Sequence, residues 1–121
     1  MPLFRVRLEL AREPLHPAGS KLHGYELVAP IDVEGHLDVA LWRDNREACS
    51  VHRFWQGEPP KHGHLTHIGD RWRFHYPGDD AGEDDPIYKL TQHRLLLGEY
   101  VSVDEDDGER HAYKIVSVQP V

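Results

Sequence analysis

Four of the ten histidines lie in one short segment, KHGHLTHIGDRWRFHY, which spans residues 61–76. Imidazole nitrogens are good ligands for Zn²⁺, Cu²⁺ and Ni²⁺. Three histidines around an ion with an open position would also be a catalytic pattern, because the metal lowers the pKa of bound water to about 7. The first question is therefore whether these histidines can share one ion.

The segment alternates like a β-hairpin whose two-residue turn is Gly69-Asp70. Successive side chains in a strand point to opposite faces. This register predicts cross-strand pairs, namely Ile68 with Arg71, His67 with Trp72, Thr66 with Arg73, Leu65 with Phe74 and His64 with His75. It predicts an apolar face that comprises Leu65, His67, Trp72, Phe74 and Tyr76. It predicts a polar face that comprises His62, His64, Thr66, Arg71, Arg73 and His75.

The candidate metal ligands are His62, His64 and His75, because His67 belongs to the apolar face. Directly paired residues have Cβ atoms about 4.5–5.5 Å apart, so His64 and His75 could bind one zinc ion. His62 lies about 7 Å further along the strand. Arg73 shares the face and repels a cation. The favoured interpretation is a solvated polar face without a cofactor, and a transition-metal site is the alternative.

Aromatic residues supply a second candidate site. Phe54 and Trp55 are adjacent in VHRFWQG, so in a strand one enters the core and the other is exposed. An exposed aromatic side chain surrounded by polar groups can anchor a partner. We therefore expect a binding surface that combines Phe54 and Trp55 with Arg71 and Arg73 of the hairpin.

Other patterns give no support for an enzyme. Cys49 and His52 would point to opposite faces of a strand, which disfavours a nucleophile–base pair. No Gly-x-Ser-x-Gly or phosphate-binding glycine loop is present. The acidic segment 77–86 lacks the ligand order of a calcium-binding EF-hand loop, so a solvated loop is expected.

The elements that must position these residues are mostly strands. Alternation predicts strands over residues 3–11, 25–29, 50–55, 87–90 and 94–103, besides the central hairpin and a C-terminal hairpin that turns at Asp106-Asp107-Gly108. Asp38 is a good N-cap for one short helix. The segment 56–63 contains two prolines and two glycines and is expected to interrupt the strands as a loop. Six to eight strands and one helix predict a single-domain antiparallel β-barrel or sandwich over residues 1–121, with an SH3-like barrel-type meander favoured.

Composition and charge restrict the cellular location and the partners that we expect. The net charge is −7 in 121 residues, which makes nucleic-acid binding an unfavoured expectation. Protonation of all ten histidines would move that charge to +3. Charged residues interrupt the first apolar stretch, no apolar run is long enough for a membrane helix, and Cys49 is the one cysteine. We expect a cytoplasmic protein that does not insert into a membrane.

At HGYELVAP and GEYVSVDEDDGERHAYKIVSV the chain resembles a family of small uncharacterised bacterial proteins. The resemblance would cover most of the chain, but it implies no activity, because these motifs are strand and turn patterns. The expected function is a non-catalytic module that binds a protein or a small ligand. The alternative is a metal-binding protein or metal-dependent hydrolase that uses the hairpin histidines.

Overall fold

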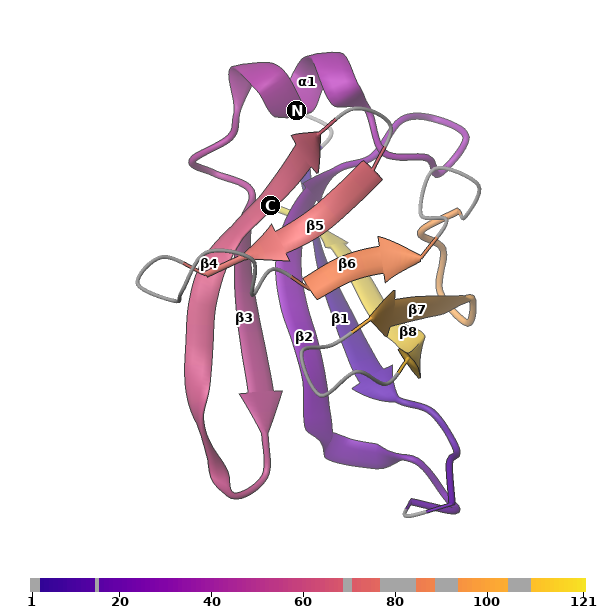
Figure 1. Cartoon of the computed structure of the whole chain (residues 1–121). Coiled ribbons are helices and arrows are strands. Elements are labelled where there is room, and N and C mark those ends of the chain that lie inside the picture. Colours follow the sequence, from indigo (N-terminus) through magenta and orange to yellow (C-terminus); the bar gives the residue numbers. More distant parts are fainter. Residues whose placement is uncertain (1–2, 15, 69–70, 77–84, 89–93, 105–109) are drawn as a thin grey trace.

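The structure is a computed structural model of the whole chain, and it describes residues 3–14, 16–68, 71–76, 85–88, 94–104 and 110–121. Eight strands and one helix occupy these residues (Figure 1). They are β1 (Leu3–Leu10), β2 (Ser20–Pro30), α1 (Val39–Asp44), β3 (Ser50–Trp55), β4 (Glu58–Ile68), β5 (Arg71–His75), β6 (Asp85–Tyr88), β7 (Tyr100–Asp104) and β8 (Arg110–Pro120).

The eight strands form an antiparallel meander that closes into a barrel. Each strand pairs with the next in sequence, and β1 also pairs with β8, so the sheet has no sandwich-like second layer. The predicted antiparallel meander is confirmed, and the barrel is the form that it takes. Closure removes the unpaired edges that an open sheet would expose.

Side chains fill the barrel interior. Trp72, Phe74, Tyr25 and Tyr113 are almost completely buried, and the Tyr25 ring lies 4.7 Å from the Phe74 ring and 5.1 Å from the Tyr113 ring. Apolar side chains from β1, β3, β4, β7 and β8 surround them. An eight-stranded barrel has just enough interior for such a core. A ligand of this protein would therefore bind outside the described core.

The prediction that residues 56–63 interrupt the strands is wrong for most of this segment. Only Gln56 and Gly57 form the turn, and β4 begins at Glu58 with Pro59 and Pro60 inside it. The β3–β4 register shifts at this point, between the pairs Arg53↔Lys61 and Trp55↔Glu58. A proline lacks an N–H, and the irregular ladder tolerates it there.

Two other boundaries differ from the expectation. β2 begins at Ser20, five residues before the expected start, because residues 20–24 pair with the end of β1 and with β3. β7 begins only at Tyr100, because Gly98 adopts φ +89° in a turn before it. The helix has its expected N-cap, since the Asp38 carboxylate accepts a hydrogen bond from Leu41 N at 3.0 Å.

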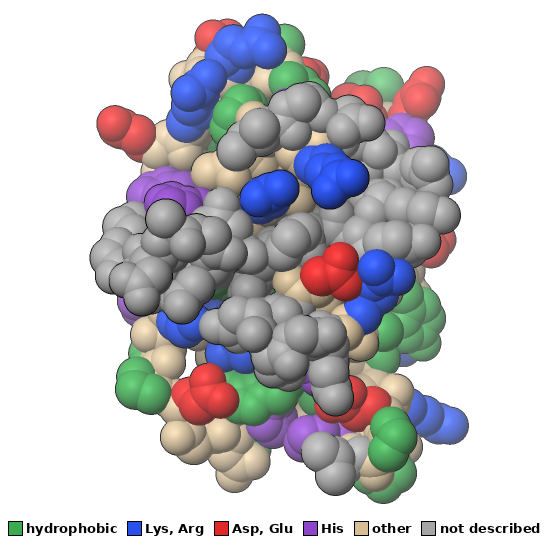
Figure 2. Space-filling view, viewed as in Figure 1, with side chains coloured by type: hydrophobic (Ala, Val, Ile, Leu, Met, Phe, Trp, Pro, Cys, Tyr) green, Lys and Arg blue, Asp and Glu red, His purple; other side chains and the backbone are tan. Residues whose placement is uncertain are grey.

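The turns expected at Gly69-Asp70 and at Asp106-Asp107-Gly108, and most of the acidic segment 77–86, lie outside the described residues. Basic and acidic side chains are interspersed on the face that Figure 2 shows. Within the described residues, no helix has the length and apolar character that crossing a bilayer requires.

Candidate functional site

The predicted register of the histidine hairpin is confirmed. β4 and β5 pair His64 with His75, Leu65 with Phe74, Thr66 with Arg73, His67 with Trp72 and Ile68 with Arg71. Leu65, Trp72, Phe74 and Tyr76 are buried, whereas His62, Arg71 and His75 are exposed. The two faces of the hairpin therefore have the expected composition.

His67 packs with the aromatic side chains of the apolar face, as expected. Its ring lies 4.5 Å from the Trp72 ring and 5.9 Å from the Trp42 ring. Trp42 comes from α1, and its indole N–H donates to the carbonyl oxygen of Leu65 at 2.8 Å. The helix thus covers this end of the barrel and holds His67 in place.

The three candidate metal ligands are placed differently from one another. His64 and His75 are direct cross-strand partners, but His62 pairs with His52 of β3, and these two rings are 4.5 Å apart. Among the described residues, no three or more His, Cys, Asp or Glu side chains are grouped so that they could hold a metal ion. The geometry therefore lends no support to zinc binding by His62, His64 and His75.

The expected binding surface is not continuous. Trp55 pairs with Glu58 at one end of β4, whereas Arg71 pairs with Ile68 at the other end, ten residues away. At about 3.3 Å per residue, roughly 33 Å of strand separates them. Arg73 lies beside Arg71, and its buried Nε has no hydrogen-bond partner among the described residues. The aromatic pair and the arginine pair cannot contact one small ligand together.

Phe54 and Trp55 do face opposite ways. Phe54 lies on the outer surface beneath the Arg7 guanidinium, whose carbon is 4.5 Å from the ring centre. Trp55 packs against the core, with its ring 4.3 Å from the His23 ring and 5.7 Å from the His111 ring. Trp55 is therefore partly buried in a polar cluster at the end of the barrel, and with Phe54 it also lines a surface pocket of about 390 Å³.

We call that group the Glu13 cluster, and its members are Glu13, His16, His23, Arg53, Trp55 and His111. The Glu13 carboxylate accepts from Nδ1 of His16 at 3.2 Å and from Nδ1 of His111 at 3.0 Å. Glu13 and His16 lie in the connection between β1 and β2, and their backbones form an isolated bridge. Histidine side chains are visible at this lower end of the molecule in Figure 2. The carboxylate thus ties the connection to β8.

His23 is the buried centre of the cluster. It is 5% exposed, its Nδ1 lies 2.6 Å from Ser20 Oγ, and its ring lies 4.6 Å from the His16 ring. Burial lowers the pKa of His23 below its ordinary value, and the nearby His16 and Arg53 lower it further. Protonation of His23 is therefore disfavoured, because a positive charge here is poorly hydrated and close to Arg53, although Glu13 and Glu58 act in the opposite direction.

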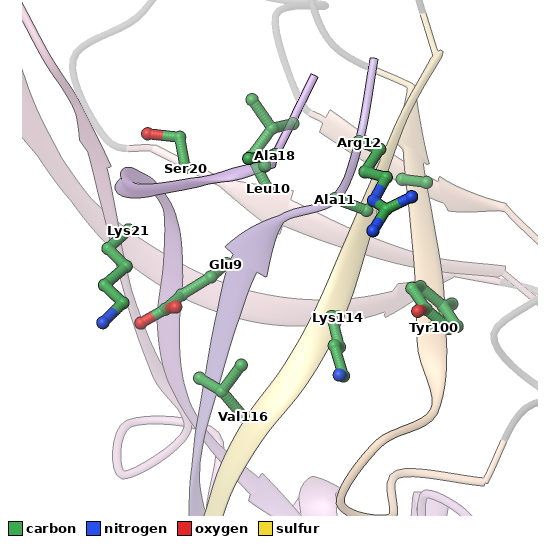
Figure 3. Close-up of a pocket in the computed structure, with 12 residues that line it drawn as sticks. Glu9, Leu10, Ala11, Arg12, Ala18, Ser20, Lys21, Tyr100, Lys114 and Val116 are labelled. Carbon is green, nitrogen blue, oxygen red and sulfur yellow. The ribbon is translucent and has the colours of Figure 1, made fainter. Parts of the chain in front are cut away.

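A pocket of about 840 Å³ lies on the outer surface next to this cluster (Figure 3). The connection between β1 and β2 forms one wall, and outward side chains of β1, β2, β7 and β8 form the rest. Its charged or hydroxyl-bearing side chains are Glu9, Arg12, Ser20, Lys21, Tyr100 and Lys114. Figure 3 shows Arg12, Tyr100 and Lys114 on one side and Glu9 and Lys21 on the other. We call it the cationic pocket.

The three cations of this pocket outnumber its one acid, Glu9, which is the direct ladder partner of Lys114. Arg12, Lys21 and Lys114 make no ion pair with any side chain that the structure describes. Glu9, the acid of the lining, is already paired with Nε of Arg7 at 2.9 Å. The pocket is therefore positive within a chain of net charge −7.

Neither the cluster nor the pocket was expected from sequence. Their residues are spread over β1, the β1–β2 connection, β2, β3, β7 and β8, and no element or site was predicted between residues 11 and 25. The spacing of Glu13 and His16 is a weak local signal, but their link to His111 spans 98 residues. Only the closed barrel brings these residues together.

The fold and the pocket define an eight-stranded antiparallel barrel with a filled interior and an open cationic pocket on its outer wall. No family model, no curated protein and no solved structure matches the chain. The proposed resemblance to small bacterial proteins therefore stays a prediction.

Proposed function

We propose that this chain is a non-catalytic binding protein whose ligand is a small organic anion held in the cationic pocket. One observation carries the proposal: three cations without described ion-pair partners, Arg12, Lys21 and Lys114, line a single pocket of an acidic protein. A concave cationic site concentrates anions, because its field is focused in the pocket.

The donors suit carboxylate, sulfonate or phosphate oxygens. The Arg12 guanidinium can form two parallel hydrogen bonds with such a group, and a lysine ammonium adds a point charge. Tyr100 and Lys114 are direct partners in the β7–β8 ladder, so their outward side chains are neighbours. Arg12 lies on the same side of the pocket (Figure 3), so an anionic group bound there would meet donors from the connection and from β8.

The pocket also offers apolar contact. The Tyr100 side chain is 53% exposed, and Val116, Ala18 and Ala112 contribute aliphatic surface to the lining. Its volume is in the range of roughly 300–1,000 Å³ that small-molecule sites occupy. An anion that carries a ring or a short apolar group fits this mixture better than a bare inorganic ion.

The arrangement favours binding without turnover. Ser20 Oγ accepts a hydrogen bond from Leu22 N at 3.1 Å and lies 2.6 Å from Nδ1 of the buried His23. In Figure 3 its hydroxyl points away from Arg12 and Lys114. A nucleophile would have to face the bound group, so the proposal assigns no reaction to Ser20.

The test is calorimetric titration of the tag-free chain with benzenesulfonate and benzoate, with benzyl alcohol as the uncharged analogue. We expect saturable binding of the two anions and none of the alcohol. Lys114→Glu should weaken binding by about tenfold or more, which corresponds to about 1.4 kcal/mol. Arg43→Glu makes the same change of charge on the exposed surface of α1 and is the matched control.

Absence of saturable anion binding would overturn the proposal. Equal weakening by Arg43→Glu would also overturn it, because attraction to the overall charge would then explain the binding.

A further inference from the structure

The connection that walls the cationic pocket is fastened to the barrel by the Glu13 cluster. Arg12 and Ala18 of the pocket wall lie on either side of Glu13 and His16 along the chain. Any movement of Glu13 and His16 away from the barrel must therefore move the pocket wall. The Glu13 cluster and the cationic pocket are therefore linked mechanically.

Resting on the proposed function, we propose that the Glu13 cluster couples anion binding to protonation, so that acidification opens the connection and releases the bound anion. The bistable element is the connection between β1 and β2. Its closed state is fastened through Glu13 to His111 of β8 and has His16 against His23 of β2. The proton of His23 is the one that binds preferentially to the open state.

The charges that face His23 come from every element around it. Glu13 and His16 face it from the connection, Arg53 from β3 and Glu58 from β4. His111 joins from β8 through Glu13 and Trp55. With neutral histidines, one arginine and two glutamates give a formal charge of −1. Protonation of His16, His23 and His111 changes this to +2 in a partly buried space.

A positive charge on His16 or His111 does not oppose the closed state. A protonated His16 or His111 still donates to the Glu13 carboxylate, and the opposite charges attract. Protonation of His23 is different, because its ring is 5% exposed and lies 4.6 Å from His16. Arg53 is also buried and acts on His23, and it pairs with Glu58 at 3.4 Å.

The sign of the effect follows from His23. Its pKa is lowered in the closed state, so the open state binds more protons once the pH falls below the ordinary histidine value. The closed state is fully favoured above that value and loses stability as the pH falls through it. Anion affinity should therefore decrease on acidification.

The overall charge of the protein predicts the opposite. Ten histidines could move the net charge from −7 towards +3, which would attract anions more strongly at low pH. The two explanations thus differ in the direction of the change. Benzenesulfonate is a suitable probe because its charge is constant over this range.

The experiment measures benzenesulfonate affinity by calorimetry at about pH 7.5 and about pH 5.5. We expect the wild-type affinity to fall by about fivefold or more at the lower pH, the lower end of usual coupling between sites. The variant with both His16→Gln and His23→Gln keeps hydrogen-bonding side chains but cannot take up these protons. Its affinity should stay constant or rise. His36→Gln, at the opposite end of the barrel, should behave like the wild type.

Opening of the connection is measured independently of any ligand. Hydrogen exchange of residues 11–20, corrected for the intrinsic effect of pH, should show protection at about pH 7.5 that is lost at about pH 5.5. Persistence of that protection, or an affinity that is unchanged or higher at low pH, would overturn the coupling. Absence of binding at both pH values together with loss of protection would instead count against the proposed function alone.

Discussion

Replacement of Glu13 by alanine should lower the free energy of unfolding by more than is usual for a residue in a surface connection. The carboxylate accepts from His111, whose side chain is 7% exposed, and from His16, whose side chain is 27% exposed. A hydrogen bond to a charged group contributes about 1.5–3 kcal/mol when buried. The more exposed His16 contact contributes less than about 1 kcal/mol. The expected loss in unfolding free energy is therefore about 1.5–4 kcal/mol.

Urea denaturation at about pH 7.5, followed by circular dichroism, measures this loss directly. Glu13→Gln retains one acceptor oxygen and should cost about half as much. Glu34→Ala is the matched control, because Glu34 also lies near a histidine, His36, at 3.9 Å, but its side chain is 76% exposed. We expect a change within about 0.5 kcal/mol for this control. A Glu13→Ala variant as stable as the Glu34→Ala variant would refute the role given to the cluster.

Two further predictions concern the barrel itself. Gly63→Ala should lower the free energy of unfolding by about 1–3 kcal/mol in urea denaturation, because a Cβ there would overlap the backbone carbonyl of His75. Ser50→Ala, an exposed change on the neighbouring strand, should lower it by less than about 0.5 kcal/mol. Equal losses for the two variants would contradict the close approach of the strands at Gly63. Cys49 is fully buried, and burial raises the pKa of its thiol to about 11. The native protein should therefore not react with a disulfide reagent at about pH 8, whereas the denatured protein should react with one equivalent. Rapid reaction of the native protein would contradict this prediction.

The parts of the fold that were predictable from sequence are those set by local rules. Alternation identified the apolar faces of β1, β5 and β8, and the assumption of a tight turn fixed the β4–β5 register residue by residue. A one-residue slip would have moved every side chain to the other face, so this agreement is informative. The same rule correctly separated His67 from the other hairpin histidines.

The errors arose where a distant contact overrides a local preference. Pro59 and Pro60 led to the prediction of a segment without strand structure, but the irregular β3–β4 ladder accommodates both prolines in a strand. No site was predicted in the connection before β2, because only the folded barrel brings His16 to His23 of β2 and Glu13 to His111 of β8. Sequence spacing cannot reveal a carboxylate that accepts from a histidine 98 residues away.

The filled core has a consequence for where binding can occur. Because aromatic side chains occupy the interior, a substitution in the core acts first on stability. The cationic pocket lies outside that core, and its wall is a connection tied to the barrel through exchangeable protons. The barrel can therefore keep a rigid interior while the connection moves. Under the proposed coupling, ligand affinity depends on the state of the Glu13 cluster, whereas the packing around Tyr25 and Trp72 acts on stability alone.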